Sequence, residues 1–142
     1  MSRILAIDYG FKRTGIAVTD PLQLIPGALD TVPTYTLLAF LADYFAREEV
    51  ECIVVGYPTQ VNGQESRTMT QIRPLVNKLR NLYPDKKVVL QDERFTSVLA
   101  QRTIREAGLG KHKRQEKALV DKVSATIILQ SYLDQLNYKH LH

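Results

Sequence analysis

The sequence predicts an α/β domain built on a mixed β-sheet, and three features of the 142-residue chain indicate this class. Short apolar segments of strand length alternate with longer segments whose apolar residues recur at helical spacing. Three strand-like segments precede that alternation, which favours a sheet with both parallel and antiparallel pairs. The composition, 44% hydrophobic and 24% charged residues, is that of an ordinary globular protein. We therefore expect a single domain over residues 1–142.

The first strand is predicted over residues 4–8, where four apolar residues run unbroken into Asp8, as in a strand buried on both faces. Gly10 and Gly15 bracket the following turn, where we expect glycine to supply positive φ angles. The second strand covers residues 16–18. A carboxylate at the end of a buried strand is costly unless it is paired, hydrogen-bonded or bound to a cation. Asp8 is therefore either a cap of its own turn or a metal ligand.

The remaining elements alternate along the chain. We expect a strand within 22–32, a helix over 34–49, a strand over 51–56, a helix over 66–82, a strand over 87–91, and helices over 96–107 and 118–136. Thr34 is the expected cap of the first helix, and Pro74 indicates a late start or a kink in the second. Ligands of such sheets gather beyond the carboxyl ends of the parallel strands.

Acidic residues stand at two of these strand ends. Asp8 ends the first strand, and Asp92 and Glu93 end the fifth. Because adjacent strand residues point to opposite faces, only one of the pair can face Asp8, and the pattern does not say which. The alternative is a solvated strand end with Arg94 as an ion partner.

Asp121 is the third acidic candidate, on a helix otherwise rich in apolar residues. Ser124 and Ala125 follow it on the same helix face, and their small side chains permit a close approach to the sheet. Its alternative role is stabilisation of the helix dipole.

Three converging carboxylates without histidine or cysteine would form a site for a hard cation, Mg²⁺ or Mn²⁺. In phosphoryl chemistry two such ions about 4 Å apart activate water and stabilise the leaving oxygen. The three histidines lack zinc-ligand spacing, and serine or cysteine nucleophile signatures and a phosphate-binding P-loop are absent from the sequence.

Basic residues flank the acidic candidates, within a formal net charge of +4. They suit contacts to nucleic-acid phosphates, although such runs are often only solvated surface. The expected contacts are Lys12, Arg13, Arg94, Lys111, Lys113, Arg114 and Lys117.

Four motifs of the chain, in order and over nearly its whole length, resemble one family. They are Ile7-Asp8-Tyr9-Gly10 with Gly15, Val54-Val55-Gly56-Tyr57-Pro58 with Gly63, Asp92-Glu93-Arg94-Phe95-Thr96-Ser97, and Val120-Asp121-Lys122-Val123-Ser124-Ala125. The chain thereby resembles the YqgF family of RuvC-like proteins, described as pre-16S rRNA nucleases and as Holliday junction resolvases. The departures are Tyr57 in place of leucine, and Lys122 and Val123 in place of small residues.

The resemblance implies a ribonuclease H-like sheet of five strands in the order 3-2-1-4-5, with the second strand antiparallel. It also implies that Asp8, Glu93 and Asp121 are the catalytic residues and metal ligands. The implied activity is a metal-dependent nuclease that processes the 5′ end of pre-16S rRNA. Alternatives are a resolvase of four-way DNA junctions and a non-catalytic RNA-binding assembly factor.

A sugar-kinase or actin-like ATPase would need two such domains, for which the chain is too short. The single cysteine, Cys52, is expected to be a buried core thiol. Without an apolar run of membrane-spanning length or a secretion signal, we expect a cytoplasmic protein that does not contact membranes. The oligomeric state is left open.

Overall fold

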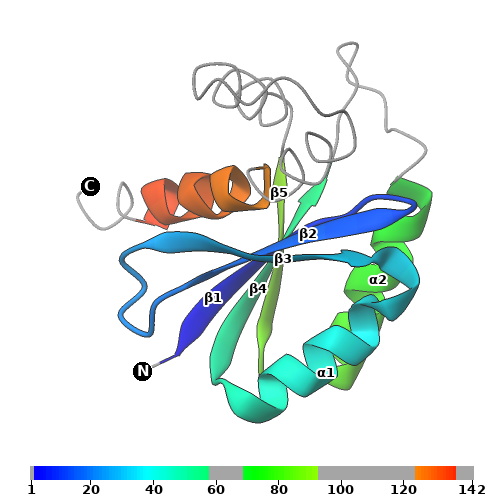
Figure 1. Ribbon diagram of the computed structural model, residues 1–142, viewed down its shortest axis with the longest axis horizontal. Coiled ribbons are helices and arrows are strands. Elements are labelled where there is room, and N and C mark those ends of the chain that lie inside the picture. Colours follow the sequence, from blue (N-terminus) through cyan, green and yellow to red (C-terminus); the bar gives the residue numbers. More distant parts are fainter. Residues whose placement is uncertain (1, 58–68, 93–123, 137–142) are drawn as a thin grey trace.

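A computed structural model of the chain describes residues 2–57, 69–92 and 124–136. The elements, shown in Figure 1, are β1 (Arg3–Asp8), β2 (Arg13–Thr19), β3 (Pro26–Pro33), the 3₁₀ turn η1 (Thr34–Thr36), α1 (Leu37–Arg47), β4 (Val50–Tyr57), α2 (Met69–Leu82) and β5 (Lys87–Asp92). Residues 124–136 form a further helix. The helices expected over 96–107 and at 118–123 lie outside the described residues.

The five strands form one sheet in the order β3-β2-β1-β4-β5. β1 pairs in parallel with β4, and β4 with β5, whereas β2 is antiparallel to both of its neighbours. This arrangement confirms the expected ribonuclease H-like order and the antiparallel second strand. Because β1, β4 and β5 are parallel, their carboxyl ends meet at one rim of the sheet.

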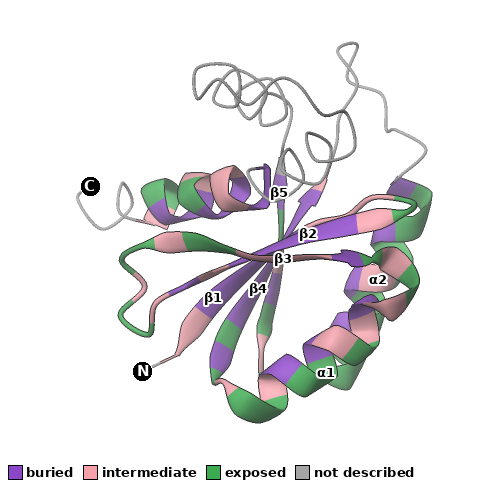
Figure 2. Cartoon of the chain, in the orientation of Figure 1, coloured by how far each residue is buried: buried purple, intermediate pink, exposed green. Residues whose placement is uncertain are grey.

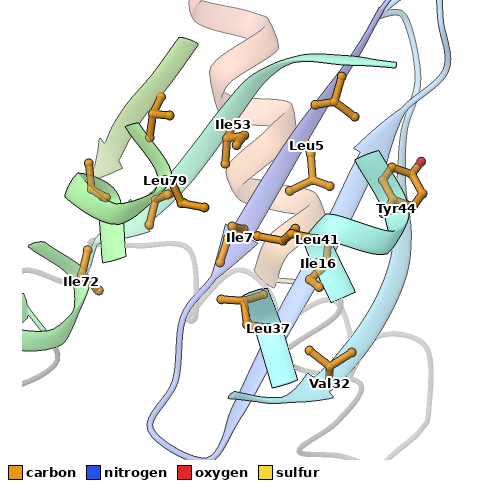
Figure 3. Packing of buried hydrophobic residues seen from close by; sticks show 14 of the residues in the cluster. Leu5, Ile7, Ile16, Val32, Leu37, Leu41, Tyr44, Ile53, Ile72 and Leu79 are labelled. Atoms are coloured by element: carbon orange, nitrogen blue, oxygen red, sulfur yellow. The ribbon is translucent and has the colours of Figure 1, made fainter. Parts of the chain in front are cut away.

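One face of the sheet packs against α1 and α2 (Figure 1). In β1 the residues on this face are Leu5 and Ile7, both fully buried. Figure 3 shows them packed against Leu41 of α1, with Ile53 of β4 in the same layer. Burying each such side chain stabilises the fold by about 1.5–3 kcal/mol.

The opposite face of the sheet packs against the helix 124–136. Ile4 and Ala6 of β1 contact this helix, so β1 is buried on both faces, as Figure 2 shows. Cys52 is buried here, as predicted, and its thiol donates to the Tyr132 hydroxyl at 3.7 Å. Burial raises the pKa of both groups.

The expectation that Thr34 caps the first helix is wrong. Thr34 opens the 3₁₀ turn η1, and α1 follows Thr36, whose side chain makes no capping hydrogen bond. The Thr34 hydroxyl instead donates to the backbone oxygen of Gly10 at 2.6 Å. The Thr34 hydroxyl therefore bonds to a residue 24 positions away in the chain and not to the first turn of the following helix. Pro74 lies within α2, which continues to Leu82.

β3 is an outer strand of the sheet. A loop over residues 20–25 separates it from β2, so β3 starts at Pro26. The Asp20 carboxylate closes that loop by accepting hydrogen bonds from the backbone amides of Leu24 and Ile25. β3 begins and ends with proline, and a register shift opposite Ile16 and Ala17 interrupts its pairing with β2. Among the helices in the described ranges, none is long and apolar enough to cross a membrane.

Candidate active site

Asp8 is the last residue of β1, at the rim where the parallel strands end. The four residues before it are buried, whereas Asp8 itself is half-buried. Its ladder partners are Gly15 on β2 and Gly56 on β4. Because both ladder partners are glycines, the two neighbouring strands place only backbone beside Asp8 at these positions.

The alternation of β1 places Asp8 on the face covered by the helix 124–136, since Ile4 and Ala6 lie on that face. In the ladder, Asp8 pairs with Gly56, which pairs with Gln91 of β5. Gln91 is buried, with 8% of its surface exposed. With strands about 4.8 Å apart, two steps separate the backbones of Asp8 and Gln91 by about 10 Å. Asp92 pairs with Tyr57, one position further along.

The N-terminal end of the helix 124–136 points toward this rim. Tyr132 contacts Cys52 near the start of β4, and Ala125 lies seven residues earlier, about 10 Å along the helix. Ser124 is 2% exposed, and its hydroxyl has no hydrogen-bond partner among the described residues. The small residues expected to permit a close approach are indeed buried against the sheet.

Of the predicted site residues, the structure places Asp8, Lys12 and Arg13 together on β1, the following turn and the start of β2. Lys12 is exposed and Arg13 is half-buried. The others lie outside the described residues: Glu93, Arg94, Lys111, Lys113, Arg114, Lys117 and Asp121. Within the part of the chain that the structure describes, no three histidine, cysteine or acidic side chains form a metal-binding group.

The turn after Asp8 is held tightly. A Cβ atom at Gly10 would lie 2.4 Å from the backbone oxygen of Arg13, so only glycine fits there. The φ angle of Gly10 is outside the left-handed region, so close approach, and not the expected positive φ, is the reason for this glycine. Thr34 joins the turn to η1, because its amide donates to the Lys12 carbonyl at 2.9 Å and its hydroxyl to Gly10.

A pocket of about 550 Å³ opens beside this turn, between the turn, η1, the start of α1 and α2. Tyr9, Phe11 and Tyr35 line it together with residues of α2. Sequence reasoning missed this pocket because its walls are far apart in the chain, and no local pattern marks Tyr9 and Phe11 as part of its lining.

The family assignment is unambiguous. The chain belongs to the RuvX family, described as Holliday junction resolvase, whose sequence model matches residues 2–135. The resemblance to YqgF proteins is thereby confirmed.

Curated relatives cover nearly the whole chain. A protein of Porphyromonas gingivalis named "Putative pre-16S rRNA nuclease" is 64% identical over 94% of this chain and 97% of its own. Proteins of the same name from Phocaeicola vulgatus and Flavobacterium johnsoniae are 59% and 52% identical, each over 97% of this chain and 99% and 100% of their own. The structure of Thermus thermophilus RuvC is similar with a TM-score of 0.52 at 13% identity, over 95% of this chain and 96% of that one. This last likeness shows the shared fold.

Proposed function

We propose that this protein is a metal-dependent nuclease that processes the 5′ end of pre-16S rRNA in the cytoplasm. The observation that carries the proposal is the place of Asp8, half-buried at the carboxyl rim between Gly15 and Gly56. A carboxylate at this rim is placed where ligands of such sheets gather, which suits binding of an ion and a phosphate oxygen. The names of the curated relatives support precursor rRNA as the substrate.

The proposed metal ligands are Asp8, Glu93 and Asp121, with Mg²⁺ or Mn²⁺ as the metal. The donor set contains only carboxylate oxygens, which are the ligands that these hard cations prefer. A bound pair of such ions would supply the activation of water and the stabilisation of the leaving oxygen. Asp8 would hold the ions at the rim. Lys12 and Arg13 would neutralise phosphates of a nucleic-acid strand that passes along the turn.

Two features of the described residues support the other two ligands. Gln91 is in the same ladder row as Asp8, so the alternation of a strand favours Glu93, two residues on, over Asp92 for the face of Asp8. The N-terminal end of the helix 124–136 points toward the rim on that same face, and Asp121 stands three residues before it in the sequence.

The experiment incubates the wild-type protein with labelled pre-16S rRNA fragments and with four-way junction DNA, with and without Mn²⁺. We expect cleavage of the rRNA only with metal. The Asp8→Asn variant keeps the shape of the side chain but removes its charge, and we expect cleavage to fall about a thousandfold or more. Asp43→Asn is the matched control, because Asp43 lies on α1 in an exposed ion pair with Arg47.

Each contrary result has a definite meaning. Wild-type turnover of Asp8→Asn would place the chemistry elsewhere. Metal-dependent cleavage of junction DNA but not of rRNA would favour the resolvase activity that the family description names. Tight RNA binding without cleavage, with or without Mn²⁺, would favour an RNA-binding assembly factor.

A further inference from the structure

We propose that the pocket beside the Asp8 turn binds an unpaired base of a single-stranded stretch of the substrate by stacking. This inference rests on the proposed nuclease function and deepens it, because it assigns the protein a preference for single-stranded over fully paired nucleic acid. The pocket lies next to the candidate active site along the chain, since its wall residue Tyr9 directly follows Asp8, and the two side chains face opposite sides of the sheet.

The aromatic residues of the pocket are placed for stacking. Tyr35 is 90% exposed and Phe11 is 54% exposed, and both line the pocket. The other large hydrophobic residues exposed in the described ranges are all aliphatic, namely Leu22, Leu24, Ile25, Leu82 and Leu90. Phe11 and Tyr35 are thus the strongly exposed aromatic residues of the described ranges, and both line this one pocket. Proteins bind single strands on aromatic side chains of this kind, because every base presents a π-face.

The polar residues of the pocket suit a nucleic acid in charge and in hydrogen bonding. Lys78 and Gln71 of α2 line it and are exposed, and no acidic side chain is among the described residues that line it. Lys12 is in the same turn as Phe11. A nucleic-acid strand that stacks a base on one of these rings would therefore meet positive charge along its phosphates, as in the grooves that bind single strands.

Hydrogen bonds also join the walls of the pocket. The Tyr9 hydroxyl donates to the Gln71 side-chain oxygen at 2.5 Å, which joins the turn after β1 to α2 across the pocket. The bonds of Thr34 to Gly10 and Lys12 fix the turn that carries Phe11. A volume of about 550 Å³ falls in the range of small-ligand sites. Preorganised walls lower the entropic cost of binding.

The pocket lies on the other side of the turn from the Asp8 carboxylate. Tyr9 packs with the core on the α1 and α2 side, whereas Asp8 is on the opposite face of the same strand. An RNA strand cleaved at Asp8 would thus pass around the turn and present a base a few nucleotides away to the pocket. A continuous duplex could not place a base in the pocket without unpairing it.

The test uses a single tryptophan as a reporter, because the natural chain contains none. The full-length Tyr35→Trp variant is titrated in EDTA with a short oligouridylate of single-stranded RNA, with a paired RNA duplex, and with inorganic phosphate. The matched control is Leu24→Trp, at a position 69% exposed that does not line the pocket. We expect the oligouridylate to quench Tyr35→Trp strongly, the duplex and phosphate to quench it little, and Leu24→Trp to respond to none.

Two further variants separate the ring from its hydroxyl group. Tyr35→Ala is expected to weaken oligouridylate binding about tenfold, and Tyr35→Phe to retain wild-type affinity. Circular dichroism confirms that each variant is folded. Equal quenching by the duplex, or unchanged affinity of Tyr35→Ala, would overturn the stacking proposal.

Cleavage assays with Mn²⁺ keep the two proposals apart. If the wild-type protein cleaves pre-16S rRNA and Tyr35→Trp is not quenched, the pocket proposal fails and the nuclease function stands. Quenching by single strands without any cleavage would support the pocket and refute the nuclease function.

Discussion

Replacing Gly10 by alanine should destabilise the protein through a single contact. The added Cβ atom would lie 2.4 Å from the backbone oxygen of Arg13, about 1 Å inside an ordinary van der Waals contact. That oxygen belongs to the first residue of β2, so the turn must open for the methyl group to fit. Opening it strains the hydrogen bond from the Thr34 hydroxyl to the Gly10 carbonyl.

Two terms set the size of the effect. Overpacking costs about 1–3 kcal/mol, and a lost hydrogen bond about 0.5–1.5 kcal/mol. We expect Gly10→Ala to lower the free energy of unfolding by about 2–4 kcal/mol. For a chain of this length the Tm should fall by about 5–15 °C.

Urea and thermal unfolding, followed by circular dichroism, measure the effect. The matched control is Gly27→Ala on β3, where the added Cβ would lie 3.9 Å from the Val18 oxygen, an ordinary contact. Its free energy of unfolding should stay within about 1 kcal/mol of wild type. A Gly10→Ala protein whose Tm is within about 2 °C of wild type would refute the steric reasoning.

Two further predictions concern charge and pH. Replacing Lys111, Lys113 and Arg114 by alanine should weaken RNA and DNA binding alike, and each lost phosphate contact should reduce the slope of log affinity against log salt by about 0.7–0.9, as titrations at several salt concentrations would measure. An unchanged slope would assign this segment to solvated surface and leave Lys12 to contact phosphates. The buried Cys52 thiol has a raised pKa, so above about pH 8.5 the unfolded chain loses its thiol proton before the native protein does. The free energy of unfolding should then fall with rising pH, and less steeply in Cys52→Ala; equal pH slopes in urea titrations would contradict this assignment.

The sequence predicted the parts of the fold that depend on local pattern. The unbroken apolar run before Asp8 predicted a strand buried on both faces, and both faces of β1 are indeed covered. The order of the strands came from the family resemblance, because pairing between distant segments leaves no local trace. Thr34 shows the limit of local reasoning, since its hydroxyl bonds to Gly10 and not to the helix that it precedes.

Some features of the candidate site likewise followed from the local sequence, and others did not. Asp8 became a candidate because of its place at the end of a strand. The choice of Glu93 over Asp92 came from the family resemblance, and the row that joins Asp8, Gly56 and Gln91 supports this proposal. The aromatic pocket could not be predicted, because Tyr35 and Phe11 line the same pocket only through the tertiary fold. Exposed aromatic residues have no periodicity that marks them as neighbours.

The two prolines that bound β3 have a consequence for self-association. An exposed outer strand offers unpaired backbone groups to the strands of other molecules, which is a common route to aggregation. Pro26 and Pro33 have no amide hydrogen to offer, and the register shift beside Ala17 bends the strand between them. We therefore expect this edge to resist edge-to-edge pairing with a second copy, so that the sheet ends here and does not extend from one molecule to the next.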